Sequence, residues 1–287
     1  MKTVKLFLCL LTVFMLTSCE DVIQVKLDEG DPMVTIDAFI NDMRSQQKVR
    51  LTYTDPYFSQ KPNNPITGAT VNLKDLTTGA NYVFSDNNNG DYILTPLDTF
   101  RIGHEYELNI IHQGVTYQSF SRLNRSTRID TLVSKFEEGG GLGNSKEGYK
   151  FAFLGFDPPG DTIDYYWIKS YRNGVFFNKG VDINICANAA YGDGADGFPF
   201  ITPIAESITP FGEVFQKFDV CRVEIHSINL ETYNFLTQVY TQTTNSGLFA
   251  TSPENVKTNI KNTTNDKVKV VGWFCMSSVG FKEGAAQ

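Results

Sequence analysis

A cysteine near the N-terminus stands where covalent lipid chemistry is expected. The chain opens with the basic segment Met1–Lys5, continues with the apolar run Leu6–Leu16, and then reads Thr17-Ser18-Cys19. This order matches the basic, apolar and small-residue parts of a secretory signal peptide. Lipoprotein maturation needs a thiol at the first position after the cut, and Cys19 supplies one. We predict a signal peptide over residues 1–18 and the attachment of lipid, such as palmitate, at Cys19. The alternative is an ordinary signal peptide followed by a chance cysteine.

The residues after Cys19 predict a tether rather than a second membrane span. The run Leu6–Leu16 is too short to cross a bilayer as a mature helix, and the later apolar stretches have the length of strands. Residues 19–30 form an acidic tether that contains Glu20, Asp21 and Asp28. Acids at this place indicate either a signal for export to the cell surface or a solvated leader. We therefore predict a lipid-anchored outer-membrane protein, and exposure at the cell surface is left open.

The charge of the chain excludes one class of partner. The formal net charge is −7, and removal of Lys2 and Lys5 with the signal peptide takes it to about −9. Arginines and lysines form no basic stripe along the sequence. Nucleic-acid binding depends on such a stripe, so no nucleic-acid partner is expected.

Three cysteines follow Cys19, at Cys186, Cys221 and Cys275, and none has CxxC spacing. An exported chain matures in an oxidising compartment, where a disulfide between Cys186 and Cys221 is one expectation. The other expectation is that the cysteines are buried free thiols, because free cysteine is among the most buried residue types.

The sequence contains few residue groups that could bind metal or catalyse a reaction. The three histidines are far apart, and the nucleophile, zinc and phosphate-loop motifs are absent. Asp193 and Asp196 lie in a glycine-rich loop and could offer oxygen ligands to calcium, but a mobile acidic loop is the favoured explanation, and no metal site is expected. We expect no cofactor and no enzymatic activity.

Two threonines lie in a pattern that some bacteria modify after export. Thr131 in Asp130-Thr131-Leu132 and Thr162 in Asp161-Thr162-Ile163 resemble Asp-Thr-aliphatic sites of O-glycosylation. The alternative is that both triplets occur by chance.

Most of the secondary-structure elements that position these residues are predicted to be strands. From Met33 onward, apolar and polar residues alternate in short runs separated by turn residues, which predicts half-buried antiparallel strands. Asn89-Gly90 predicts a hairpin turn, because both residues tolerate positive φ. About seven such strands predict a β-sandwich over residues 31–125.

A second β-rich domain is predicted over residues 126–287. It contains one amphipathic helix near residues 230–243, with Asn229 as its N-cap. In Tyr165-Tyr166-Trp167 the neighbouring rings must point to opposite faces, so some of them face an interface or form an exposed aromatic shelf for sugar or peptide. Packing between domains is the simpler explanation.

Several short motifs in a fixed order resemble those of the outer-membrane lipoprotein family known as domain of unknown function 4249 (DUF4249). They are Cys19-Glu20-Asp21, Met33–Ile40, Ile66–Leu73, Phe156–Tyr166, Leu248–Val256, Asn259-Ile260 and Val271–Phe274, with Trp273 where a tyrosine is usual. The resemblance implies a lipoprotein of the kind often encoded beside TonB-dependent transporters, with an immunoglobulin- or transthyretin-like N-terminal part. It implies no catalytic residues.

These expectations lead to one principal hypothesis about function. We predict a non-enzymatic accessory or binding component of a TonB-dependent nutrient-uptake system, with the transporter as its partner. The loops Glu137–Gly148 and Tyr191–Phe198 are the predicted contacts, because mobile loops on rigid sandwiches commonly carry recognition. A structural or adhesive surface lipoprotein and a surface hydrolase of glycan or peptide remain as alternatives.

Overall fold

The computed structural model describes residues 30–56, 59, 64–95, 100–125, 127–140, 146–160, 162–188, 197–200, 204–206, 208–245 and 254–287. Pro32–Gln287 form one compact unit. Among the described residues, no helix has the length and apolar character needed to cross a bilayer.

The prediction of a mainly β fold is confirmed, and α2 (Leu230–Thr244) is the single α-helix of the described part. The strands are β1 (Val34–Asn41), β2 (Gln47–Tyr53), β3 (Thr70–Asp75), β4 (Asn81–Asp86), β5 (Asp91–Leu94), β6 (Glu105–His112), β7 (Val115–Arg122), β8 (Arg128–Glu137), β9 (Gly148–Phe156), β10 (Tyr165–Arg172), β11 (Val175–Phe176), β12 (Asn184–Ala187), β13 (Val220–Ile228), β14 (Lys261–Asn262) and β15 (Val270–Ala285).

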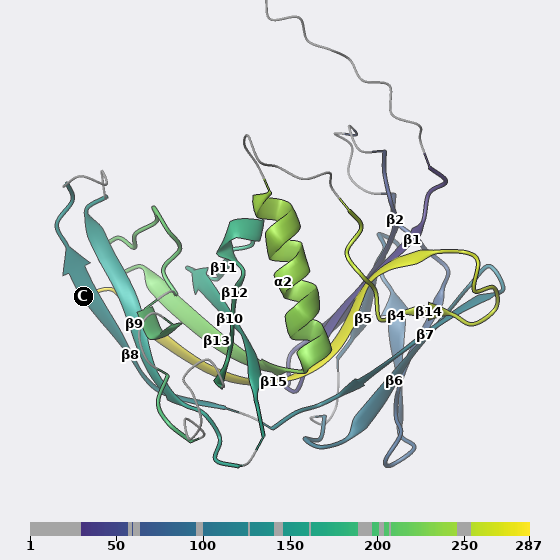
Figure 1. Cartoon of the computed structure of the whole chain (residues 1–287), viewed down its shortest axis with the longest axis horizontal. Helices are drawn as coiled ribbons and strands as arrows, with labels where there is room; N and C mark the ends of the chain where they lie inside the picture. The colour runs from purple at the N-terminus through teal and green to yellow at the C-terminus, as the bar shows by residue number, and fades with distance from the viewer. Residues whose placement is uncertain are drawn as a thin grey trace, which may run out of the picture. The chain divides into compact units, whose positions relative to one another are not determined.

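One large mixed sheet connects most of these strands (Figure 1). Its order is β11-β10-β13-β15-β1-β2-β5-β4-β3-β6-β7-β14, with β12 paired to β10, while β8 and β9 form a separate two-stranded sheet. The pair between β1 and β15 is parallel, and β13 pairs antiparallel with the second half of β15. The 16-residue strand β15 therefore joins the strands of the N-terminal region to those of the C-terminal region.

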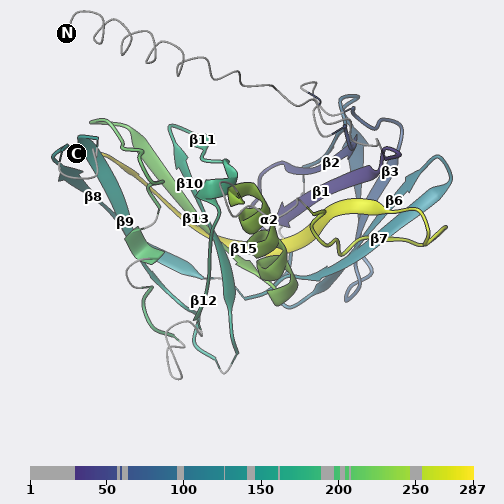
Figure 2. The same ribbon diagram turned by 45° about the horizontal axis from the view of Figure 1, so that its top comes forward.

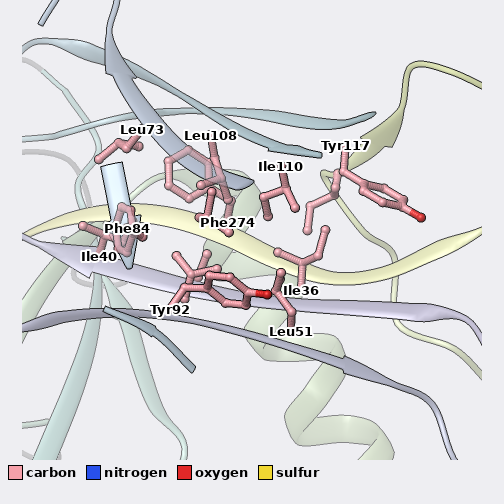
Figure 3. Close-up of a cluster of buried hydrophobic side chains, with 14 of the residues drawn as sticks. Ile36, Ile40, Leu51, Leu73, Phe84, Tyr92, Leu108, Ile110, Tyr117 and Phe274 are labelled. Atoms are coloured by element: carbon pink, nitrogen blue, oxygen red, sulfur yellow. The ribbon is translucent and has the colours of Figure 1, made fainter. Parts of the chain in front are cut away.

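The N-terminal strands bury one face in a shared core, as their alternation predicted. Every second residue of β1 is buried, namely Val34, Ile36, Ala38 and Ile40. Figure 3 shows Ile36 and Ile40 beside Leu73, Leu108 and Ile110, and also Phe274 from β15. The predicted Asn89-Gly90 hairpin is present between β4 and β5, where Gly90 has a φ of 85°.

A second core lies between the β8–β9 sheet and one face of β10 and β13. Phe151 and Phe153 from β9 pack there with Tyr166 and Ile168 from β10. Along β15, a Cβ at Gly280 would lie 2.4 Å from the carbonyl oxygen of Thr127. The lack of a side chain at Gly280 thus allows the start of β8 to approach β15 closely.

Helix α2 covers the opposite face of β10, β13 and β15 (Figures 1 and 2). Asn229 caps it as predicted, because its side-chain oxygen accepts a hydrogen bond of 2.9 Å from the backbone N–H of Thr232. Phe235 on the helix stacks on Trp273 of β15, with ring centroids 4.5 Å apart. The helix is therefore held by aromatic packing on the sheet.

The aromatic run of β10 packs against other elements on both of its faces. Tyr166 is fully buried in the core beneath β8 and β9. On the other face, Tyr165 packs on Tyr233 of α2, and Trp167 meets Phe39 of β1 with centroids 5.2 Å apart. Packing between elements, rather than an exposed shelf for sugar or peptide, thus explains these rings.

Strand β15 contributes buried side chains to both halves of the fold. Phe274 and Met276 belong to the core of the N-terminal strands, whereas Trp273 and Cys275 belong to the cluster between the sheet and α2. The division of the chain at residue 125 into two domains stays a prediction, and the sharing of β15 suggests a direct test of it.

Candidate functional site

Cys19, the predicted lipidation site, and the candidate calcium ligands Asp193 and Asp196 all lie outside the described residues. Within the described part, no group of three or more histidine, cysteine or acidic side chains is arranged to hold a metal ion. The predicted contact loop Tyr191–Phe198 also lies mostly outside the described residues, while both ends of Glu137–Gly148 are described.

Both candidate O-glycosylation threonines are exposed. Thr131 follows an irregularity in the pairing of β8 with β9, and Thr162 lies in the turn before β10. O-glycosylation requires a residue that solvent can reach, and both threonines meet this requirement. Their modification remains a prediction.

The three cysteines that the structure describes, Cys186, Cys221 and Cys275, are free thiols, so the disulfide considered between Cys186 and Cys221 is absent. Cys186 pairs with Tyr166 on one side of β10, and Cys221 pairs with Arg172 on the other side. Six residues of strand separate these positions along the chain, about 20 Å. A disulfide requires Cα atoms within about 7 Å, so this strand order forbids the bridge.

Burial keeps these thiols unreactive. Desolvation raises the pKa of Cys186 and of Cys221 to about 12. A thiol with such a pKa is protonated at neutral pH and is a poor nucleophile. The alternative of buried free cysteines therefore describes this fold.

The three histidines occupy separate hydrogen-bonded positions. The ring of His104 contacts Asp75 at 2.8 Å, and His112 contacts the hydroxyl of Tyr53 at 3.1 Å. His226 lies between Ser277 and Glu224, with distances of 3.0 Å from its Nδ1 to Ser277 Oγ and 3.1 Å from its Nε2 to Glu224 Oε2.

The hydrogen-bonded series Ser277–His226–Glu224 has the order of groups found in the catalytic triads of hydrolases, but its position in the fold indicates a structural role. All three residues are buried. Glu224 also accepts hydrogen bonds from Tyr171 at 2.9 Å and from Arg222 at 2.7 Å. A buried hydroxyl within a sheet cannot reach a substrate, so this network serves to satisfy buried polar groups.

The charges of this network follow from burial and hydrogen bonding. Burial, aided by the positive charge of Lys169, lowers the pKa of His226 to about 4, so the imidazole is neutral at pH 7. Burial opposes ionisation of Glu224, but hydrogen bonds from His226, Tyr171 and Arg222 outweigh it and lower the pKa of Glu224 to about 2.

The strongest candidate site is a cleft of about 930 Å³ beside the β8–β9 hairpin. It is lined by residues of β8 and β9, the 3-10 helix Gly180–Asp182, the segment Thr209–Val214, and Tyr240 of α2. Phe211, Val181 and Val133 line it with more than half of their surface exposed. Exposed apolar side chains scattered singly are ordinary, but several around one cleft indicate a binding surface.

A rigid turn presents Phe211 to this cleft. The backbone N–H of Glu213 donates to the carbonyl of Pro210 at 3.0 Å, and Gly212 between them has a φ of 76°. This geometry is that of a type II turn, which places Phe211 at its tip.

The two ends of this segment are fixed to the sheets. Thr209 Oγ1 accepts a hydrogen bond of 3.0 Å from the backbone of Phe151, and the Val214 carbonyl accepts one of 2.8 Å from Arg172. The backbone that carries the exposed ring is therefore fixed at both ends, as a preorganised binding surface requires.

Charged groups of both signs surround the apolar part of the cleft. Lys150 and Glu137 form an ion pair of 2.6 Å, and Glu213 pairs with Arg172 at 3.3 Å. Glu137 and Lys146 belong to the predicted contact loop Glu137–Gly148, so the structure brings part of that loop to the cleft. An apolar centre within a polar margin is the usual anatomy of a protein interface.

The family model for domain of unknown function 4249 matches residues 20–283 of this chain. The chain belongs to the DUF4249 family. The match covers nearly all of the predicted mature chain and confirms the resemblance that the motifs suggested. No curated protein matches the chain. The DUF4249 model carries no function, so the cleft is interpreted from its own residues.

Sequence reasoning missed most of the residues of the cleft. The available signal was Pro210-Phe211-Gly212, a turn sequence with an aromatic residue at the position that a turn exposes. No local pattern indicates that this turn, Val181 and Val133 line one surface, because they come from segments far apart in the chain.

Proposed function

We propose that this DUF4249 protein is a lipid-anchored, non-enzymatic accessory or binding component of a TonB-dependent nutrient-uptake system at the outer membrane. The cleft beside Phe211 is the observation that carries the binding part of this proposal. The anchoring part rests on the sequence around Cys19, and the transporter as partner rests on what family membership implies. Anchoring confines both partners to one membrane, so a modest interface is well occupied.

The size and surface of the cleft support a role in binding. Its volume of about 930 Å³ lies within the range of ligand sites in proteins. Phe211 and Tyr240 offer aromatic surface, which gives large contact area at small cost in side-chain entropy. We propose that a segment of the transporter or its substrate contacts this surface.

The finer fold assignment belongs to the same proposal. We propose that the strands of residues 31–125 form an immunoglobulin- or transthyretin-like sandwich and that residues 126–287 form a second sandwich-like domain. The separate clustering of buried side chains on either side of β15 supports this arrangement.

The test is a pull-down in mild detergent with the lipid anchor intact, followed by quantitative mass spectrometry. The variant Val181→Ser/Phe211→Ser removes apolar surface from the cleft. The matched control is Val83→Ser/Phe120→Ser, which removes exposed apolar side chains elsewhere. We expect a large outer-membrane β-barrel to co-purify with the wild type and the control, and to be depleted at least about tenfold with the cleft variant.

A structural or adhesive surface lipoprotein is the second candidate. It would show no β-barrel enrichment over an unrelated lipoprotein, and that result would overturn the accessory function. Equal loss of the barrel in the cleft variant and the control would instead show that the partner does not bind specifically at the cleft.

A further inference from the structure

A second cleft, of about 910 Å³, lies at the place where the tether joins the body. It is lined by residues of the segment 255–271, which includes β14 and leads into β15, and by Met33. In Figure 1 this segment is the yellow chain that passes β14 before it enters β15. Met33 directly precedes β1, and Val34 pairs with Val270 of β15.

Positive charge gathers around this cleft in an otherwise acidic protein. Lys257, Lys261 and Lys269 line it and are exposed, and Asp266 is the one acid among the lining residues. The whole chain carries a formal charge of −7, so this surface has the opposite sign to the molecule. Such a local surface attracts anions even when the net charge does not.

Hydrogen bonds fix the segment that carries these lysines. The Asn259 side chain spans to Phe274, donating to its carbonyl at 2.8 Å and accepting from its backbone N–H at 3.0 Å. Thr258 Oγ1 donates to the carbonyl of Gly272 at 2.8 Å. At the far end of the segment, the backbone N–H of Thr263 donates to the carbonyl of Thr116 at 2.9 Å. The lysines therefore stand on a rigid scaffold.

The chain enters the compact body beside this cleft. Met33 follows Cys19 by 14 residues, which span at most about 50 Å when fully extended. The compact body begins at Pro32, and the next residue, Met33, lines the same cleft as the lysines. Of the two clefts, this one includes a residue from the start of the body.

We propose that the cleft lined by Lys257, Lys261 and Lys269 binds phosphate groups of anionic lipids in the membrane that holds the anchor. This inference rests on the proposed anchoring at Cys19. Lysine ammonium groups bind phosphate as compact point charges, and basic residues next to an anchor strengthen membrane attachment. The contact would orient the body by holding the β1 end toward the membrane.

The test uses the mature chain with Cys19→Ser, so that binding to vesicles cannot come from the anchor. Co-sedimentation is measured with phosphatidylcholine vesicles and with vesicles containing about one third phosphatidylglycerol. We compare this chain with the charge-reversal variant Lys257→Glu/Lys261→Glu/Lys269→Glu. The matched control is Lys74→Glu/Lys217→Glu/Lys282→Glu, which reverses three exposed lysines outside both clefts. Thermal melting checks that all chains fold.

We expect binding to the anionic vesicles only, a loss of at least about tenfold in the Lys257/Lys261/Lys269 variant, and little change in the control. Binding should also weaken in high salt, because exposed charges are screened. Equal loss in both variants, or binding independent of anionic lipid, would overturn the proposal. Should a charge-reversal variant melt early, the milder Lys→Gln triple replaces it. Lipid labelling of the native chain tests anchoring separately. A failure of the proposed anchoring can therefore be distinguished from a failure of the proposed binding to lipid phosphate.

Discussion

The imidazole of His226 connects three strands of the large sheet. It lies on β13, contacts Ser277 of β15, and shares Glu224 with Tyr171 of β10. Lys169 and Arg222 are the cations whose charges act on it. Because the ring is neutral when folded and titrates near its ordinary value when unfolded, it makes stability depend on pH.

We expect the free energy of unfolding to fall as the pH drops from 6.5 to about 4. In this window the unfolded chain binds a proton at His226 that the folded chain excludes, since burial lowers the folded pKa to about 4. The difference in pKa corresponds to about 3 kcal/mol. The depressed pKa of Glu224 extends the loss below pH 4.5, in the same direction.

Urea unfolding between pH 7 and 4 measures this effect. His226→Gln should flatten the profile more than His112→Gln, because His112 is less buried. An unchanged slope in His226→Gln would show that other groups cause the pH dependence.

The second prediction at the scale of a residue concerns Cys19. Cys19→Ser should leave the chain without lipid and out of the membrane fraction, because serine offers no thiol for transfer of the diacylglyceryl group. Palmitate labelling with membrane fractionation measures the result. Normal labelling of the variant would refute lipidation at this cysteine.

Among the elements, the parallel pair of β1 and β15 depends on one glycine. Gly272 has a φ of 105°, and a Cβ there would lie 2.0 Å from the carbonyl oxygen of Ile36. Both the backbone conformation and the closeness of β1 therefore require glycine.

Gly272→Ala should destabilise the protein by about 3 kcal/mol or more, from unfavourable φ and from overpacking against β1. Gly79→Ala is the matched control, because Gly79 also has a positive φ of 79° but has nothing within 4 Å of its Cβ position. We expect it to cost only about 1 kcal/mol. Equal losses in denaturant unfolding would show that the contact with Ile36 is unimportant.

At the scale of the molecule, β15 determines how the two halves depend on each other. Residues 31–125 alone lack Phe274, Met276 and Ile260, which are all buried in the N-terminal core. Loss of one such side chain costs about 2–5 kcal/mol, and small domains have only about 5–15 kcal/mol of stability.

We therefore expect the fragment of residues 31–125 to be unfolded, whereas Pro32–Gln287 unfolds cooperatively. Far-UV circular dichroism and NMR dispersion of both chains measure this. A stably folded fragment would instead support an independent N-terminal domain with its boundary near residue 125.

The sequence by itself determined the local elements of this protein. The alternation at Val34–Ile40 predicted β1, and Asn89-Gly90 predicted the hairpin between β4 and β5. Asn229 with the apolar spacing after it predicted α2. These features follow from the period of side chains along a strand or helix, which is a property of a few consecutive residues. The family also followed from short motifs in order, and the family model confirmed it.

Only the tertiary structure decided what those elements bring together. The parallel pairing of β1 with β15 joins residues more than 230 positions apart, and the same strand order separates Cys186 from Cys221. Both clefts likewise combine distant segments, such as Val133 with Phe211 and Met33 with Lys261. A strand's period fixes which side chains share a face but not which strand lies beside it, because pairing depends on the packing of the whole core.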